Sequence, residues 1–171
     1  AKVSDFKELK ASALGDYVPA KLGMAEDEKA VFMVLTKDYS GTMIFAFENG
    51  KIAKVPLSAY ETKTNRKKLT GAYSDKAPLA EILYLQNDCE LVLTSSQGRV
   101  LLFHTGAISE KSSRATIGVN VLTVKKGHRL ISAVIYEEGS LAKPNRYRTK
   151  TLPAAGSTLS VEDKAEQLSL L

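Results

Sequence analysis

Basic side chains gather between residues 51 and 68, where they outnumber acidic side chains six to one. The single acid there is Glu61, and the whole chain has a formal net charge of +5. A dense positive patch attracts polyanions such as nucleic acid, although charge alone does not identify the polyanion. The competing interpretation is a solvated face that only keeps the protein soluble. The six cations are Lys51, Lys54, Lys63, Arg66, Lys67 and Lys68.

Residue types that carry out catalysis or bind metals are few and widely spaced. Cys89 is the only cysteine, which excludes an internal disulfide and a cysteine-based metal site, and we expect it to be a small buried side chain. His104 and His128 fall at a predicted strand end and in a predicted turn. The sequence lacks a glycine-rich phosphate loop, a His-Glu-x-x-His motif and a Gly-x-Ser-x-Gly motif. We therefore expect no catalytic site, no metal and no cofactor in this chain.

A hairpin that recurs after 48 residues positions the cations. In FENGKIAKVPL, residues 47–57, the Asn-Gly pair predicts a tight turn whose two residues both tolerate positive φ. Residues 42–60 align with residues 90–108, apolar residue over apolar residue, with Lys51 over Arg99. A cation therefore occupies the same position in both hairpins, just after each turn.

A basic stretch with an arginine and then a glycine follows each hairpin, as Arg66 and Gly71 and again as Arg114 and Gly118. A fainter third copy covers residues 129–156, with a longer turn and a basic second strand. Repeated units of short strands predict an all-β, propeller-like fold of about three hairpin-based blades. The expected strands lie at 30–36, 42–48, 51–56, 80–85, 90–95, 99–104, 117–123, 129–136 and 146–151.

We expect three segments: an N-terminal linker or short helix at 1–29, the blades at 30–153, and a polar, frayed tail at 154–171. The amphipathic stretch at 4–17 is the candidate helix. No apolar run approaches the roughly 20 residues that span a bilayer, so we expect no membrane contact and a cytoplasmic location. The chain starts without Met or an apolar signal segment, which suggests a piece of a longer protein.

The hairpins FAFENGKIAKVPLSAY and VLTSSQGRVLLFHTGAI, each followed by a basic segment, resemble blades of the β-pinwheel. This fold is the DNA-wrapping C-terminal domain of type IIA topoisomerase A subunits, those of gyrase and topoisomerase IV. The segments TKTNRKKL and YRTKTLPAAG add to the resemblance, which covers roughly residues 30–153. It implies a basic rim that bends duplex DNA. It also implies an accessory role beside the rest of the A subunit and an ATPase B subunit, on nucleoid DNA.

The resemblance implies that the DNA-binding residues are the cations at corresponding positions of the repeat. They are Lys51, Lys54, Lys63, Arg66, Lys67, Lys68, Arg99, Lys111, Arg114, Arg146, Arg148 and Lys150. Tyr147 follows Arg146, as the DNA-cleaving tyrosine of these enzymes follows an arginine, but that nucleophile belongs to a separate upstream domain. We therefore expect Tyr147 to pack within a strand. Tyr60 and Tyr73 flank the first basic stretch and either pack at strand ends or stack on bases.

The sequence departs from gyrase in two respects. It has no heptapeptide of the type Gln-Arg-Arg-Gly-Gly-Arg-Gly, which gyrase tails use for chiral wrapping, and its array of blades is shorter. Both features favour a topoisomerase IV-like tail that supports decatenation or relaxation over supercoiling. The alternative function is a propeller-like module that docks an acidic protein partner.

Overall fold

The computed structural model describes residues 1–62 and 70–163. Tertiary contacts divide the chain into two compact units. The first comprises Ala1–Leu35 with Thr62–Thr70, and the second comprises Thr36–Glu61 with Gly71–Leu171.

The described part of the first unit forms two short helical elements, the 3₁₀ helix η1 (Val3–Asp5) and α1 (Val18–Leu22). A proline lies in the first turn of α1, where no backbone donor is needed, and Gly23 ends the helix with φ 63. The helix considered at 4–17 is not formed, because this stretch is largely non-helical. Its Leu14 is 96% exposed, and a short helix without a packing partner is unstable. None of the described helices is long and apolar enough to cross a membrane.

The strand expected at residues 30–36 is absent from the structure, and this prediction is wrong. Val31 is 64% exposed and Met33 is 81% exposed, so this apolar run has no sheet to pack against. A strand needs a partner for its backbone groups, whatever its own propensity. The first strand therefore begins at Thr42.

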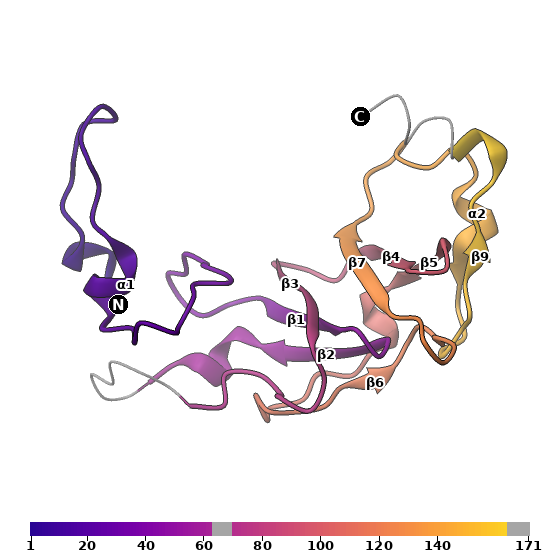
Figure 1. Cartoon of the computed structure of the whole chain (residues 1–171), viewed down its shortest axis with the longest axis horizontal. Coiled ribbons are helices and arrows are strands. Elements are labelled where there is room, and N and C mark those ends of the chain that lie inside the picture. The colour runs from indigo at the N-terminus through magenta and orange to yellow at the C-terminus, as the bar shows by residue number, and fades with distance from the viewer. Residues whose placement is uncertain (63–69, 164–171) are drawn as a thin grey trace. The chain divides into compact units, whose positions relative to one another are not determined.

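The first sheet of the second unit has the strand order β3-β1-β2-β6 (Figure 1). Thr42 in β1 lies opposite Pro56 in β2 and opposite Leu85 in β3, and all these pairs are antiparallel. The predicted strand at 117–123 is reduced to the two residues of β6, which pair with Lys51 and Ile52. The strands span Thr42–Phe47 (β1), Lys51–Pro56 (β2), Leu79–Leu85 (β3) and Val119–Asn120 (β6).

The second sheet repeats this plan with the order β7-β4-β5-β8, and β9 also pairs with β5. A register shift between Ala46 and Phe47 in β1 recurs between Thr94 and Ser95 in β4. The repeat thus extends to a bulge at the same position. The strands span Glu90–Ser95 (β4), Arg99–His104 (β5), Leu130–Ile135 (β7), Arg148–Thr149 (β8) and Ser157–Thr158 (β9).

Both hairpins turn over three residues, 48–50 and 96–98. The Gly50 amide donates to the Phe47 carbonyl at 2.9 Å, and the Gly98 amide donates to the Ser95 carbonyl at 2.9 Å. Only the glycine of each turn has positive φ, 80° for Gly50 and 67° for Gly98. The expectation of positive φ at Asn49 is therefore wrong, because a three-residue hairpin needs just one left-handed residue.

The described residues form two sheets rather than about three blades. The first strand of the third sequence copy is β7, which pairs with β4 as β3 pairs with β1. The strand expected at 146–151 is instead the helix α2 (Pro144–Tyr147) followed by β8. Pro144 favours the first turn of a helix, and the third copy lacks the glycine turn that closes the other hairpins.

The C-terminal segment is folded as far as Asp163, contrary to the expectation of a frayed tail from residue 154. Its strand β9 pairs with β5, and Asp163 is buried, where a carboxylate oxygen accepts from the Ala142 amide at 2.6 Å.

One apolar core joins the two sheets. Ile44 and Ile52 from the first sheet and Leu93 and Phe103 from the second are almost fully buried in the same cluster. Burying each such side chain contributes about 1.5–3 kcal/mol. Cys89 packs partly buried against this core, as expected of a small apolar side chain, and burial raises the pKa of its thiol. The prediction of an all-β, sheet-based fold is confirmed.

Candidate nucleic-acid interface

The basic segment after the second hairpin returns to the first sheet and lies along the edge of β2 that faces away from β1. The Lys111 amide donates to the Lys54 carbonyl at 2.9 Å, and β6 extends the sheet at the start of β2. Gly118 permits this approach, because a Cβ there would lie 2.4 Å from the Ile52 carbonyl oxygen. The cations of one sequence repeat thus border the sheet of the previous one.

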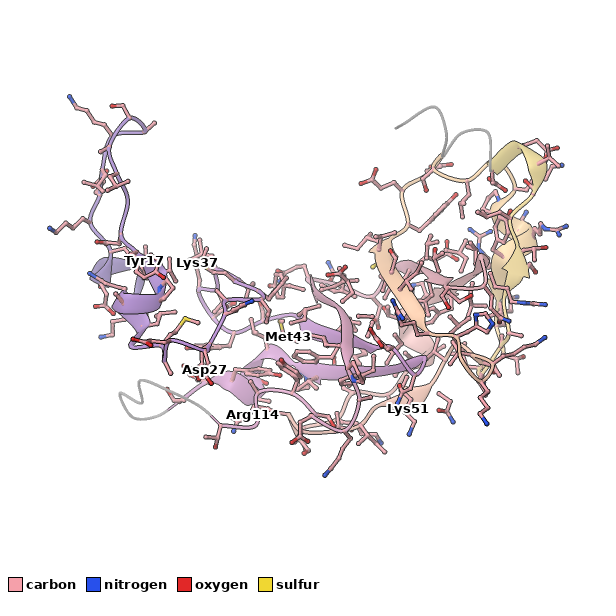
Figure 2. The ribbon with its side chains drawn as sticks, in the orientation of Figure 1. Tyr17, Asp27, Lys37, Met43, Lys51 and Arg114 are labelled. Carbon is pink, nitrogen blue, oxygen red and sulfur yellow. The ribbon has the colours of Figure 1, made fainter. Side chains whose placement is uncertain are left out.

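Three predicted DNA-binding residues follow this edge, namely Lys51, Lys111 and Arg114. Lys111 is exposed, and within the described part of the chain the Lys51 ammonium has no hydrogen-bond or ion-pair partner. Figure 2 shows Lys51 and Arg114 near opposite ends of β2. A strand of this length spans roughly 17–20 Å, so the two cations are placed for different phosphates of an extended polyanion.

Arg114 is held in place by aromatic and backbone contacts. Its guanidinium lies 5.9 Å from the centre of the Tyr60 ring, and its Nη1 donates to the Ala59 carbonyl at 3.3 Å. The Tyr60 hydroxyl donates to the Ala72 carbonyl at 2.6 Å, and burial raises the pKa of Tyr60 to about 12. Tyr73 stacks on Phe45 with the ring centres 5.5 Å apart. Both tyrosine rings are therefore engaged within the protein rather than offered as platforms for bases.

The corresponding edge of β5 carries the cations of the third sequence copy. Arg99 starts β5, and its Nη1 donates to the Gly156 carbonyl at 2.7 Å. Arg146 is exposed, with its Nε directed to the Thr158 carbonyl at 3.3 Å, and Lys150 is exposed as well. These residues keep their charge, since a carbonyl neutralises none of it. The outer edges of both sheets are thus basic.

Arg148 differs from its neighbours because Glu90 neutralises it. Nε and Nη2 of Arg148 donate to the two carboxylate oxygens of Glu90 at 2.6 Å and 2.8 Å, a bidentate pair. These hydrogen bonds raise the pKa of Arg148 and lower that of Glu90. Arg148 is therefore a weaker candidate for a phosphate contact than Arg146 or Lys150.

Lys54 is buried, and the prediction that it lies on an exposed rim is wrong. The residue is 6% exposed, and its Nζ lies 2.5 Å from Oδ1 of Asp88 in the turn between β3 and β4. Thr105 donates to the same oxygen at 2.7 Å, and its carbonyl lies 3.5 Å from Nζ. The side chain alternates inward from β2, so it connects the first sheet to both ends of the second hairpin. Lys54 is a structural cation.

Four of the predicted DNA-binding residues lie outside the described residues. They are Lys63, Arg66, Lys67 and Lys68.

Comparison with known proteins identifies domains that this chain resembles. The family model described as "DNA gyrase C-terminal domain, beta-propeller" matches residues 90–137, the segment that holds β4, β5, β6 and β7. The A subunit of DNA topoisomerase 4 from Staphylococcus epidermidis is 25% identical over 126 residues, 72% of this chain. The chain is thus similar to the C-terminal domains of the A subunits of gyrase and topoisomerase IV.

Two solved structures share the fold of this chain. The C-terminal domain of DNA topoisomerase IV superimposes with a TM-score of 0.68 at 22% identity over 81% of this chain. The C-terminal domain of DNA gyrase A gives a TM-score of 0.59 at 15% identity over 81% of this chain. The chain spans 43% and 50% of these two domains, and 16% of the topoisomerase 4 protein.

Tyr147 is buried in this pinwheel domain and packs as part of its scaffold. It is 2% exposed, its hydroxyl donates to Asp163, and the hydroxyl oxygen accepts from the Ser160 amide at 2.8 Å. A nucleophile must reach a phosphorus atom, which these contacts prevent. The expectation that Tyr147 packs is met, although it ends the helix α2 rather than lying in a strand.

The sequence pattern missed three polar residues of the pinwheel domain, Asn49, Ser74 and Lys76, which line one hollow together with Lys51. Lys76 lies in the connection between β2 and β3, outside the segments that align in the repeat. The only sequence signal at this hollow is the Asn-Gly pair, which by itself indicates a hairpin turn and no binding site.

Proposed function

We propose that this pinwheel domain binds duplex DNA through phosphate contacts along the outer edges of β2 and β5. One observation carries the proposal: the outer edge of each sheet combines an exposed or half-buried cation of its own strand with cations from a segment that follows later in the chain. Lys51, Lys111 and Arg114 lie along β2, while Arg99, Arg146 and Lys150 lie along β5. Lys63, Arg66, Lys67 and Lys68 extend the proposed interface by sequence position. Cations without a pattern of base-edge contacts bind the backbone and do not read sequence.

The binding test is a titration of the purified domain with a fluorescent duplex at several salt concentrations. If about five phosphates are contacted, the logarithm of the affinity falls with log salt at a slope of about −4 to −5. The triple variant Lys51→Ala, Lys111→Ala and Arg114→Gln should flatten that slope by up to about 3 on every duplex sequence. The matched control neutralises Lys2, Lys7 and Lys10 in the first unit. An unchanged slope in the interface variant would favour docking of an acidic protein instead.

We propose further that the domain serves a type IIA topoisomerase whose A subunit extends beyond this chain and works with an ATPase B subunit on nucleoid DNA. The short array and the missing gyrase heptapeptide support decatenation or relaxation over supercoiling. The purified holoenzyme should therefore decatenate linked circles at a higher rate than it introduces negative supercoils. Efficient supercoiling of a relaxed plasmid by that holoenzyme would refute this assignment.

A further inference from the structure

A hollow of about 140 Å³ opens beside the first hairpin and is lined by a mixed set of side chains. Phe47, Ala77 and Ile117 form its apolar part, while Asn49, Lys51, Ser74 and Lys76 supply polar groups. None of the described lining residues is acidic. The hollow therefore combines two ammonium groups with an apolar wall.

The neutral polar groups of the hollow have hydrogen-bond donors that are not used within the described residues. The Asn49 side-chain oxygen accepts from the Lys51 amide at 3.1 Å, which leaves the Asn49 NH₂ group available. The Ser74 hydroxyl oxygen accepts from the Lys76 amide at 3.3 Å, and among the described residues its O–H donates to no acceptor. Ser74 is only 3% exposed, so its O–H has little access to bulk water. A ligand that offers several acceptor oxygens satisfies these donors together.

The second sheet provides an internal comparison for Lys51. The equivalent cation there, Arg99, already donates to the Gly156 carbonyl at 2.7 Å. Lys51 has no such partner within the described residues, although it occupies the same position in the hairpin. Among the described residues, the first hairpin thus pairs a partner-free cation with a hollow.

We infer that this hollow is a subsite for one phosphodiester of the duplex backbone, with Lys51 and Lys76 on the phosphate and the apolar wall against the adjoining sugar. The inference rests on the proposed DNA binding and adds Lys76, Asn49 and Ser74 to it. Two ammonium groups offset the single negative charge of a phosphodiester, and together with two neutral donors they can satisfy its acceptor oxygens. The contacts position the backbone and carry no sequence preference.

The test compares Lys76→Ala with Lys126→Ala, which removes the same charge from an exposed turn outside the hollow. Lys76→Ala removes one of the two cations on that phosphate, so it should flatten the salt slope by up to about 0.9, equivalent to up to about fivefold weaker duplex binding at 0.15 M salt. Lys126→Ala should leave both quantities unchanged. Ser74→Ala should also weaken binding without altering the slope, because it removes a neutral donor. Circular dichroism verifies that each variant is folded.

The outcomes separate the two proposals. A wild-type domain that fails to bind duplex refutes DNA binding itself. A wild-type domain that binds with the expected slope, while Lys76→Ala behaves like Lys126→Ala, refutes only the subsite. Inorganic phosphate at matched ionic strength should not displace the duplex at micromolar concentration. Displacement at that concentration would overturn the subsite in favour of a free-anion site.

Discussion

Asp88→Ala is expected to lower the free energy of unfolding by about 3–5 kcal/mol, because it leaves the buried Lys54 ammonium without a counter-charge. Lys54→Met should cost less, about 1–2 kcal/mol, since the Asp88 side chain is 41% exposed and can be hydrated once its partner is gone. Asp88→Ala should be the more destabilising of the two variants because the Lys54 side chain, which it leaves unpaired, is only 7% exposed. Urea denaturation of the two variants and of the double variant measures the effects and their coupling.

The same variants separate a structural lysine from a DNA contact. Under conditions in which it is folded, Lys54→Met should bind duplex DNA with an unchanged salt slope. A slope flattened by about 0.9 would return Lys54 to the DNA-binding residues. Greater destabilisation by Lys54→Met than by Asp88→Ala would contradict the burial argument.

The pH dependence of this contribution has a defined sign. Hydrogen bonds from Lys54 and then from Thr105 lower the pKa of Asp88 in the folded protein. The contribution of the ion pair is therefore complete above the unfolded-state aspartate pKa of about 3.9, and it is lost as the pH falls below that value. The stability difference between wild type and Asp88→Asn should accordingly narrow in acid.

The hairpins could be predicted from sequence because their signals are local. The strand predicted at 42–48 is observed at Thr42–Phe47, and those predicted at 51–56 and 99–104 have the predicted bounds. Each prediction rests on an apolar run that is interrupted by a glycine turn. Burial of that run in the shared core stabilises the hairpin. The recurrence after 48 residues then predicted a propeller-like fold, and the resemblance of the hairpins to known blades suggested the pinwheel.

The remaining features depend on contacts between distant residues. The segment at 111–120 follows the second hairpin but borders the first sheet, and nothing in its composition shows that it returns. Lys54 and Lys51 occupy one basic strand, yet Lys54 meets Asp88 at the core, while Lys51 has no partner among the described residues. A count of charges cannot separate them. Counting alternate residues from the strand start would have placed Lys54 and Ile52 on the same inward face.

The two hairpin glycines offer a matched test of how tightly residues 111–122, the return segment that borders the first sheet, are packed. Both have positive φ, so either alanine variant bears a backbone cost of about 1–2 kcal/mol. A Cβ at Gly98 meets nothing within 4 Å, whereas a Cβ at Gly50 would lie 2.0 Å from the Leu122 carbonyl oxygen.

Gly50→Ala is therefore expected to cost about 3–5 kcal/mol in the free energy of unfolding, against about 1–2 kcal/mol for Gly98→Ala. The excess arises because the Gly50 carbonyl accepts from the Val121 and Leu122 amides at 3.2 Å and 3.0 Å, and the added methyl group forces that backbone away. Leu122 belongs to the core that both sheets share, so the displacement also loosens the segment that positions Arg114. Urea denaturation gives the two costs, and duplex titration of Gly50→Ala should show weaker binding than of Gly98→Ala. Equal stability of the two variants would mean that the return segment does not pack on the first hairpin.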